Sequence, residues 1–132
     1  MLENTLDRLK EFISAKKEIS LAFLFGSQVK GYARPISDYD LAVWFIKAPE
    51  LGKIDRLWRE IEKIVGKEVD LVILNNARPT VAWAALRGKK ILIRDWRLYF
   101  NLILNVSTEA EDMQDFNISL WNLKEKIRSA PL

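Results

Sequence analysis

The sequence predicts an α/β fold of the α+β kind, in which a small mixed β-sheet of about four strands is flanked by helices. Short apolar runs alternate with longer segments whose apolar residues recur every three or four positions. Hydrophobic residues make up 49% of the 132 residues and charged residues 30%, which is typical of a globular protein. We therefore expect a single domain over 1–132, with a core at about 19–95 and a helical tail at about 96–130.

The apolar runs and the helical periodicity give the elements in order. Strands are predicted at about 19–25, 40–46, 67–74 and 89–94. Helices are predicted at about 2–13, 51–65, 79–86, 96–104 and 116–127. Gly66 is placed to end the second helix and Pro79 to begin the third, because glycine favours the position after a helix and proline favours its first turn.

The composition excludes several kinds of chemistry. There is no cysteine and no histidine, so disulfides, zinc–thiolate sites, thiol catalysis and the usual general base are excluded. Carboxylates, lysines, tyrosines or hydroxyls must carry any reaction. No apolar run approaches the ~18 residues of a membrane helix and the first residues do not form a signal peptide, so we expect a cytoplasmic protein with no membrane partner. The net charge of +3 favours phosphate-bearing partners only weakly.

The stretch from Gly26 to Asp40 holds the candidate chemistry. Asp38 and Asp40 are two residues apart at the start of a predicted strand, so their side chains should leave the same face. Two carboxylates that close repel each other, and a cation, water or a raised pKa must relieve the repulsion. Gly26 and Ser27, in a turn just upstream, could bring backbone N–H groups to a phosphate. The alternatives are a solvated acidic turn for the aspartates and a helix N-cap for Ser27.

A family resemblance favours the catalytic interpretation of the stretch from Gly26 to Asp40. Gly26-Ser27, ten intervening residues and then Asp38-Tyr39-Asp40 resemble the signature of the DNA polymerase beta-like nucleotidyltransferase superfamily. The short chain is similar to the minimal nucleotidyltransferase branch, whose members are antitoxin partners of HEPN-domain toxins. The resemblance covers about residues 19–95. It implies the polymerase beta-like fold, with a glycine turn and an aspartate pair at one end of the sheet.

The resemblance also implies a third acid and a metal site. Asp70 interrupts an apolar strand at the place where the superfamily carries this acid; alternatively, it lies at an exposed strand end or pairs with a lysine. By resemblance, Asp38, Asp40 and Asp70 are the catalytic residues and the ligands of two Mg²⁺ ions, with Mn²⁺ as a substitute. Three further residues would bind the nucleotide: Gly26, Ser27 and Lys30.

The function that the resemblance implies is the transfer of AMP from ATP to a protein hydroxyl. The acceptor would be a tyrosine of a HEPN ribonuclease toxin, whose modification silences it. An alternative is a binding module that neutralises its partner by contact alone, because Gln28 and Lys30 stand where the family more often has arginines. Another is transfer to a small molecule such as an aminoglycoside, although only about 35 residues follow Asp95 and could form a substrate domain.

Two further groups of residues suggest surfaces. A basic run could steer a triphosphate or meet an acidic partner, or it could be a solvated face; its members are Arg78, Arg87, Lys89, Lys90, Arg94 and Arg97. A nucleic-acid partner is not expected, because few aromatic residues are interleaved with these charges. An aromatic group could form a surface for a partner or for a homo-oligomer, and its members are Trp96, Tyr99, Phe100, Phe116 and Trp121.

Overall fold

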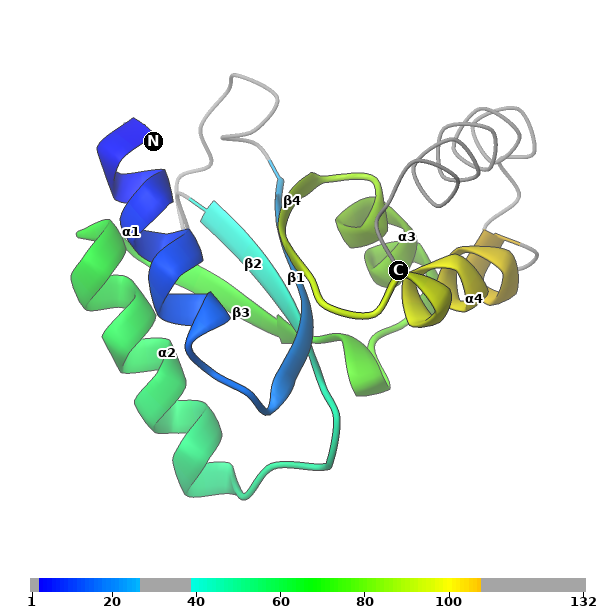
Figure 1. The fold of residues 1–132 in the computed structure, drawn as a ribbon, viewed down its shortest axis with the longest axis horizontal. Helices are drawn as coiled ribbons and strands as arrows, with labels where there is room; N and C mark the ends of the chain where they lie inside the picture. The colour runs from blue at the N-terminus through cyan, green and yellow to red at the C-terminus, as the bar shows by residue number, and fades with distance from the viewer. Residues whose placement is uncertain (1–2, 27–38, 108–132) are drawn as a thin grey trace.

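The computed structural model describes residues 3–26 and 39–107. Its elements follow the predicted order along the chain (Figure 1). The helices are α1 (Glu3–Ser14), α2 (Leu51–Val65), the 3₁₀ turn η1 (Leu74–Asn76), α3 (Pro79–Leu86) and α4 (Trp96–Ser107). The strands are β1 (Ile19–Phe25), β2 (Tyr39–Phe45), β3 (Val69–Ile73) and β4 (Lys89–Ile93).

The strands form one mixed sheet in the order β3-β2-β1-β4, which confirms the predicted fold class. β1 lies between β2 and β4 and is antiparallel to both, whereas β2 and β3 are parallel. Every residue of β1 is buried, as expected for a strand that is apolar on both faces. The parallel pair is joined by α2, the crossover helix that such a connection needs.

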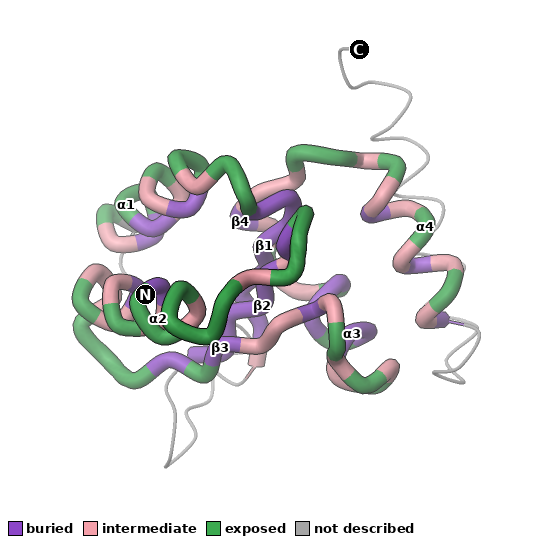
Figure 2. The backbone as a smooth tube through the Cα atoms, turned by 90° about the horizontal axis from the view of Figure 1, so that it is seen from below, coloured by how far each residue is buried: buried purple, intermediate pink, exposed green. Residues whose placement is uncertain are grey.

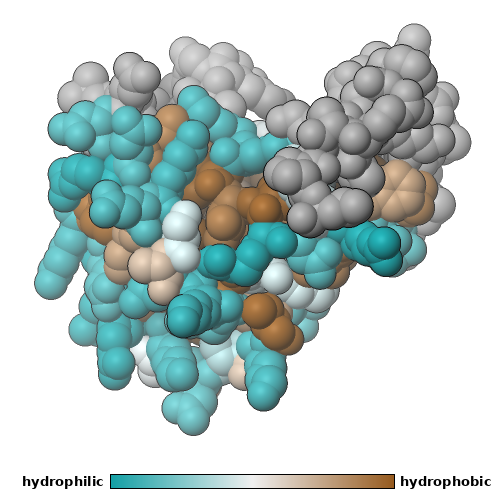
Figure 3. All heavy atoms as spheres, in the orientation of Figure 1, coloured by the Kyte–Doolittle hydropathy of each residue, from teal (hydrophilic) through white to brown (hydrophobic). Residues whose placement is uncertain are grey.

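Helices cover both faces of the sheet, and each face has its own apolar core. α1 and α2 lie on one face and α3 and α4 on the other (Figure 1). In Figure 2 the buried residues of α1 and α2 lie on the side of each helix that faces the sheet. Hydrophilic residues cover much of the outer surface on this side of the molecule (Figure 3). Among the described helices, none is long and apolar enough to cross a membrane.

Most predicted boundaries agree with the structure to within a residue or two. α3 has the predicted bounds, and Gly66 ends α2 in the left-handed conformation at φ 75°. β3 is shorter than predicted because the chain turns into η1 at Leu74. α4 is longer and continues to Ser107. The helix predicted at 116–127 lies outside the described residues.

Two apolar residues differ in burial from what the sequence suggested. Leu51 fits the apolar spacing of the helix predicted at 51–65, but it is the first residue of the helix and is 84% exposed. Tyr99 was expected in a partner surface, but it is buried. Its hydroxyl donates to the carbonyl of Leu86 at 3.0 Å, and its ring lies 5.4 Å from the ring of Phe23. Burial raises the pKa of Tyr99 to about 12, so this phenol is a structural donor that joins α4 to α3.

Two polar side chains connect segments that are distant in sequence. Arg94 donates to the carbonyls of Ile19 and Ser14 at 3.0 Å, so this member of the basic run fastens the end of β4 to α1 and β1. Asn75, in η1, exchanges two hydrogen bonds of 2.9 Å with the backbone of Phe45. The amide of Asn75 therefore extends the pairing of β2 beyond the end of β3.

We expect Asn75→Ala to lower the free energy of unfolding by about 2 kcal/mol, because it leaves the N–H and C=O of Phe45 without their partners. Asn76→Ala is the matched control, since Asn76 is the next residue of the same turn and is exposed. Urea unfolding of both variants measures the difference. Equal losses for the two would show that the Asn75 amide contributes nothing beyond the turn itself.

Candidate active site

Two of the predicted catalytic acids lie next to each other in the sheet. Asp40 is the second residue of β2 and Asp70 the second residue of β3, and the two are direct partners in the parallel register. Adjacent strands lie about 4.8 Å apart, and paired residues point to the same face of the sheet. The two carboxylates therefore leave one face at one end of the sheet.

The two acids differ in their exposure to solvent. Asp40 is 5% exposed, whereas Asp70 is exposed and has no ion pair within the described ranges 3–26 and 39–107. The exposure of Asp70 agrees with the alternative that this residue lies at an exposed strand end. Its position beside Asp40 agrees with the alternative that it is the third catalytic acid. A buried carboxylate costs free energy unless polar groups or a cation compensate it. The pair thus offers one enclosed and one accessible acid.

The start of β3 is held in place by α2. The N–H of Val69 donates to the carboxylate of Glu62 at 3.0 Å. The carbonyl of Val69 accepts a hydrogen bond from the indole N–H of Trp58. Both backbone groups of the residue before Asp70 are therefore fixed by side chains of the crossover helix. The register that pairs Asp40 with Asp70 depends on this edge strand staying in place.

Gly26 supplies the third part of the site. It follows β1 directly, has φ 95°, and lies where β1 ends beside Asp40, since Phe25 pairs with Asp40. A Cβ built on Gly26 would overlap the Oδ2 atom of Asp40. A side chain at position 26 would therefore meet the carboxylate as well as an unfavourable backbone conformation. The bare backbone of Gly26 is in contact with the buried acid.

The turn between α3 and β4 packs against the same end of β1. A Cβ on Gly88 would lie 2.6 Å from the carbonyl oxygen of Leu24 and 2.8 Å from the Cβ of Phe25. This close approach brings Arg87, whose guanidinium carbon lies 5.1 Å from the centre of the Trp83 ring, to the end of the sheet that carries Gly26. The sequence predicted that the helix beginning at Pro79 stops at Gly88, but it did not predict this contact with β1.

The predicted basic run does not form a single face. Lys90 lies over the ring of Tyr99 at 5.7 Å, on the side of α4. Arg94 reaches the opposite side of the sheet, where it binds carbonyls at the end of α1. Of the run, Arg87 and its neighbour Lys89 are the members nearest the end of β1, because Lys89 pairs with Leu24.

Part of the predicted site lies outside the described residues. These positions are Ser27, Gln28, Lys30 and Asp38. Within 3–26 and 39–107, no group of three acidic side chains is close enough to hold a metal ion. The pairing of Asp40 with Asp70 is observed, whereas the triad completed by Asp38, its metal ligation and the nucleotide contacts of Ser27 and Lys30 stay predictions.

The sequence is similar to a known family and to characterised proteins. Residues 7–98 match the family model described as "Polymerase beta, Nucleotidyltransferase". A protein adenylyltransferase MntA from Thermococcus cleftensis is 34% identical over 90 residues, which cover 63% of this chain and 91% of the relative. The described acids Asp40 and Asp70 both fall within the matched range.

Solved structures share the fold. A toxin–antitoxin complex with AMP-PNP aligns with a TM-score of 0.65 and 19% identity, covering 92% of this chain and 97% of that one. An MNT antitoxin in complex with a tri-AMPylated HEPN toxin of Shewanella oneidensis aligns with the same TM-score and coverage at 15% identity. At such identities the likeness shows the fold alone, which is the one that the sequence predicted.

Gly26→Ala should impair stability, because the added methyl group meets Asp40 Oδ2 and the backbone conformation at φ 95° disfavours an L-residue. We expect a loss of about 1–3 kcal/mol in the free energy of unfolding, measured in urea. Gly52→Ala is the control: nothing lies within 4 Å of its Cβ position inside α2, so alanine should stabilise the helix by up to about 1 kcal/mol. A Gly26→Ala variant as stable as the wild type would contradict the observed contact.

Proposed function

Because the chain belongs to the polymerase beta nucleotidyltransferase family, we propose that it transfers AMP from ATP to a hydroxyl of another protein. The observation that carries the proposal is the parallel pairing of Asp40 with Asp70, next to Gly26 at the end of β1. Phosphoryl chemistry needs acidic oxygens beside a place where a phosphate approaches the backbone. This end of the sheet carries the acidic oxygens, and the backbone turn that begins at Gly26 would receive the phosphate.

In the proposed reaction, the acceptor oxygen attacks the α-phosphorus of ATP and forms a new P–O bond. The bond from the α-phosphorus to the oxygen of the β-phosphate breaks, and pyrophosphate leaves. Asp70 would receive the proton of the acceptor, and its exposure to solvent supports this role. Asp40, which is buried against Gly26, is placed to hold charge in a fixed position.

The donor set of the site suits a hard divalent cation. Asp40 and Asp70 present carboxylate oxygens from adjacent strands, and such oxygens are the ligands that Mg²⁺ prefers. With Asp38 as the third ligand, they would hold two Mg²⁺ ions, for which Mn²⁺ can substitute. When bound, Mg²⁺ neutralises charge on the phosphates and lowers the pKa of the acceptor hydroxyl. By the family resemblance, Gly26, Ser27 and Lys30 would bind the triphosphate beside these ligands.

The acceptor that we propose is a tyrosine of a HEPN-type toxin, which makes this protein the antitoxin of the pair. Two findings support the choice. The Thermococcus relative is named a protein adenylyltransferase, and the Shewanella structure contains an AMPylated HEPN toxin with its MNT antitoxin.

Substitution of either described acid should remove the transfer. With Mg²⁺, ATP labelled at the α-phosphate and the cognate HEPN-type toxin, we expect Asp40→Asn and Asp70→Asn to lower the rate of labelling on the order of a hundredfold or more. Each change removes a charge that the reaction needs while nearly preserving side-chain volume. Asp55→Asn, at an exposed position of α2, is the matched control and should label as the wild type does. Unchanged labelling by both Asp40→Asn and Asp70→Asn would refute this mechanism.

A binding module that acts by contact alone is the second candidate, favoured by Gln28 and Lys30 at positions where the family more often has arginines. Co-expression with the toxin separates the two candidates. Growth rescued by a variant with Asp38→Ala, Asp40→Ala and Asp70→Ala together would support contact alone. Loss of rescue, with the variant still folded and bound to the toxin, would support transfer.

A further inference from the structure

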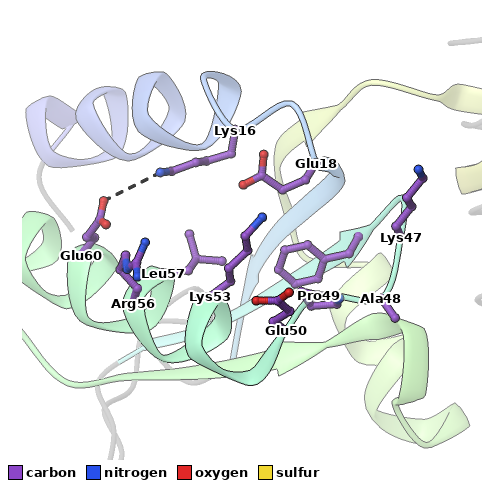
Figure 4. Close-up of a pocket in the computed structure, with 11 residues that line it drawn as sticks. Lys16, Glu18, Lys47, Ala48, Pro49, Glu50, Lys53, Arg56, Leu57 and Glu60 are labelled. Atoms are coloured by element: carbon purple, nitrogen blue, oxygen red, sulfur yellow. Dashed lines mark ion pairs between the residues drawn. The ribbon is translucent and has the colours of Figure 1, made fainter.

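A pocket of about 380 Å³ lies at the other end of the sheet (Figure 4). Its lining comes from three segments: the turn between α1 and β1, the chain from the end of β2 to α2, and one side of α2. Phe45, Leu57 and Pro49 make up the apolar part of this lining. A pocket of this size accommodates one or two side chains of another molecule.

Charged side chains surround the apolar part of the pocket. Lys16 and Glu60 form an ion pair of 3.9 Å across it. Lys53 and Arg56 project from the same side of α2, and no ion pair within 4 Å is formed by either among the described residues. Glu18 lies on the facing wall. Lys47 and Glu50 also line the pocket, so its charged residues are of both signs, and Lys53 and Arg56 are the cationic part of its rim.

Exposed apolar residues flank the pocket. Ile46 is 58% and Leu51 84% exposed, and they are the large hydrophobic residues that stand out as exposed among those described. They bracket residues 47–50, which form one wall of the pocket. A small molecule inside the pocket would leave both side chains in water, whereas a protein partner would cover them. Exposed apolar residues beside a concave site are typical of a protein interface.

This surface is separate from the candidate active site. Asp40 lies at the beginning of β2 and Phe45 at its end, five residues apart in extended chain. At about 3.3 Å per residue, the strand places the pocket some 16 Å from the carboxylates. A partner can therefore occupy the pocket while ATP binds at the other end.

We propose that this pocket, with Ile46 and Leu51, is a docking site for a protein segment that carries an apolar side chain next to carboxylates. The apolar side chain enters between Phe45 and Leu57, and the carboxylates meet Lys53 and Arg56 on the rim. The docking site does not rest on the proposed transfer of AMP.

A display experiment tests the docking site without knowledge of the natural partner. The full chain is immobilised, phage displaying random 12-residue peptides are selected, and enriched peptides are synthesised with a fluorophore for anisotropy titrations. We expect enriched sequences to place Leu, Ile or Phe beside Asp or Glu. Lys53→Glu combined with Arg56→Glu, and separately Leu51→Ser, should weaken the binding of these peptides by about tenfold. All three positions are exposed, so folding should be preserved.

The controls make each outcome decisive. Lys63→Glu changes the same charge on α2 outside the pocket and should leave peptide affinity within about twofold of wild type. ATP binding should be unchanged in every variant, which separates this surface from the catalytic end. Failure to enrich peptides, enrichment without acidic residues, or equal binding by the Lys53→Glu/Arg56→Glu variant would overturn the proposal. So would a concentration-dependent dimer in light scattering that Leu51→Ser abolishes, because it would assign the surface to a second copy of the chain.

Discussion

The parallel pairing of β2 with β3 is the constraint on which the candidate site depends. A shift of one residue in this register would turn Asp70 to the other face of the sheet and into the core under α1 and α2. β3 is an edge strand, so the sheet holds it from one side only. The other restraint comes from Trp58 and Glu62, whose side chains bind the backbone of Val69. α2 covers one face of the sheet, and through Val69 it fixes the position of Asp70, whose side chain leaves the opposite face.

The sequence predicted the parts of this arrangement that follow from local rules. Strand alternation identified the Asp-x-Asp pair, apolar runs identified the strands, and Gly66 and Pro79 marked helix ends. The pairing of Asp40 with Asp70 came only from the family resemblance, because strand order is set by contacts between distant segments. The role of Asp38 stays a prediction, as do those of Ser27 and Lys30, since these residues lie outside the described ranges.

The apolar periodicity of the sequence wrongly indicated burial at the start of α2, where the helix extends past the sheet that it covers. Leu51 fits the apolar stripe of α2 in sequence, yet it occupies the first position of the helix and stays in solvent. Tyr99 stood among other aromatic residues and suggested a surface, but tertiary contacts with Phe23 and Leu86 bury it. The pocket beside Phe45 had no sequence signal, because its lining joins the turn between α1 and β1 to the chain around the start of α2, which only folding brings together.

The contact between the backbone of Gly26 and the carboxylate of Asp40 has a consequence for directed evolution of this protein. Every replacement at position 26 introduces the same Cβ, so all nineteen alternatives meet the same obstacle and a library that randomises this codon yields mostly inactive clones. Efforts to redirect the enzyme toward new acceptors should therefore diversify the exposed neighbourhood of Asp70 and keep the glycine invariant.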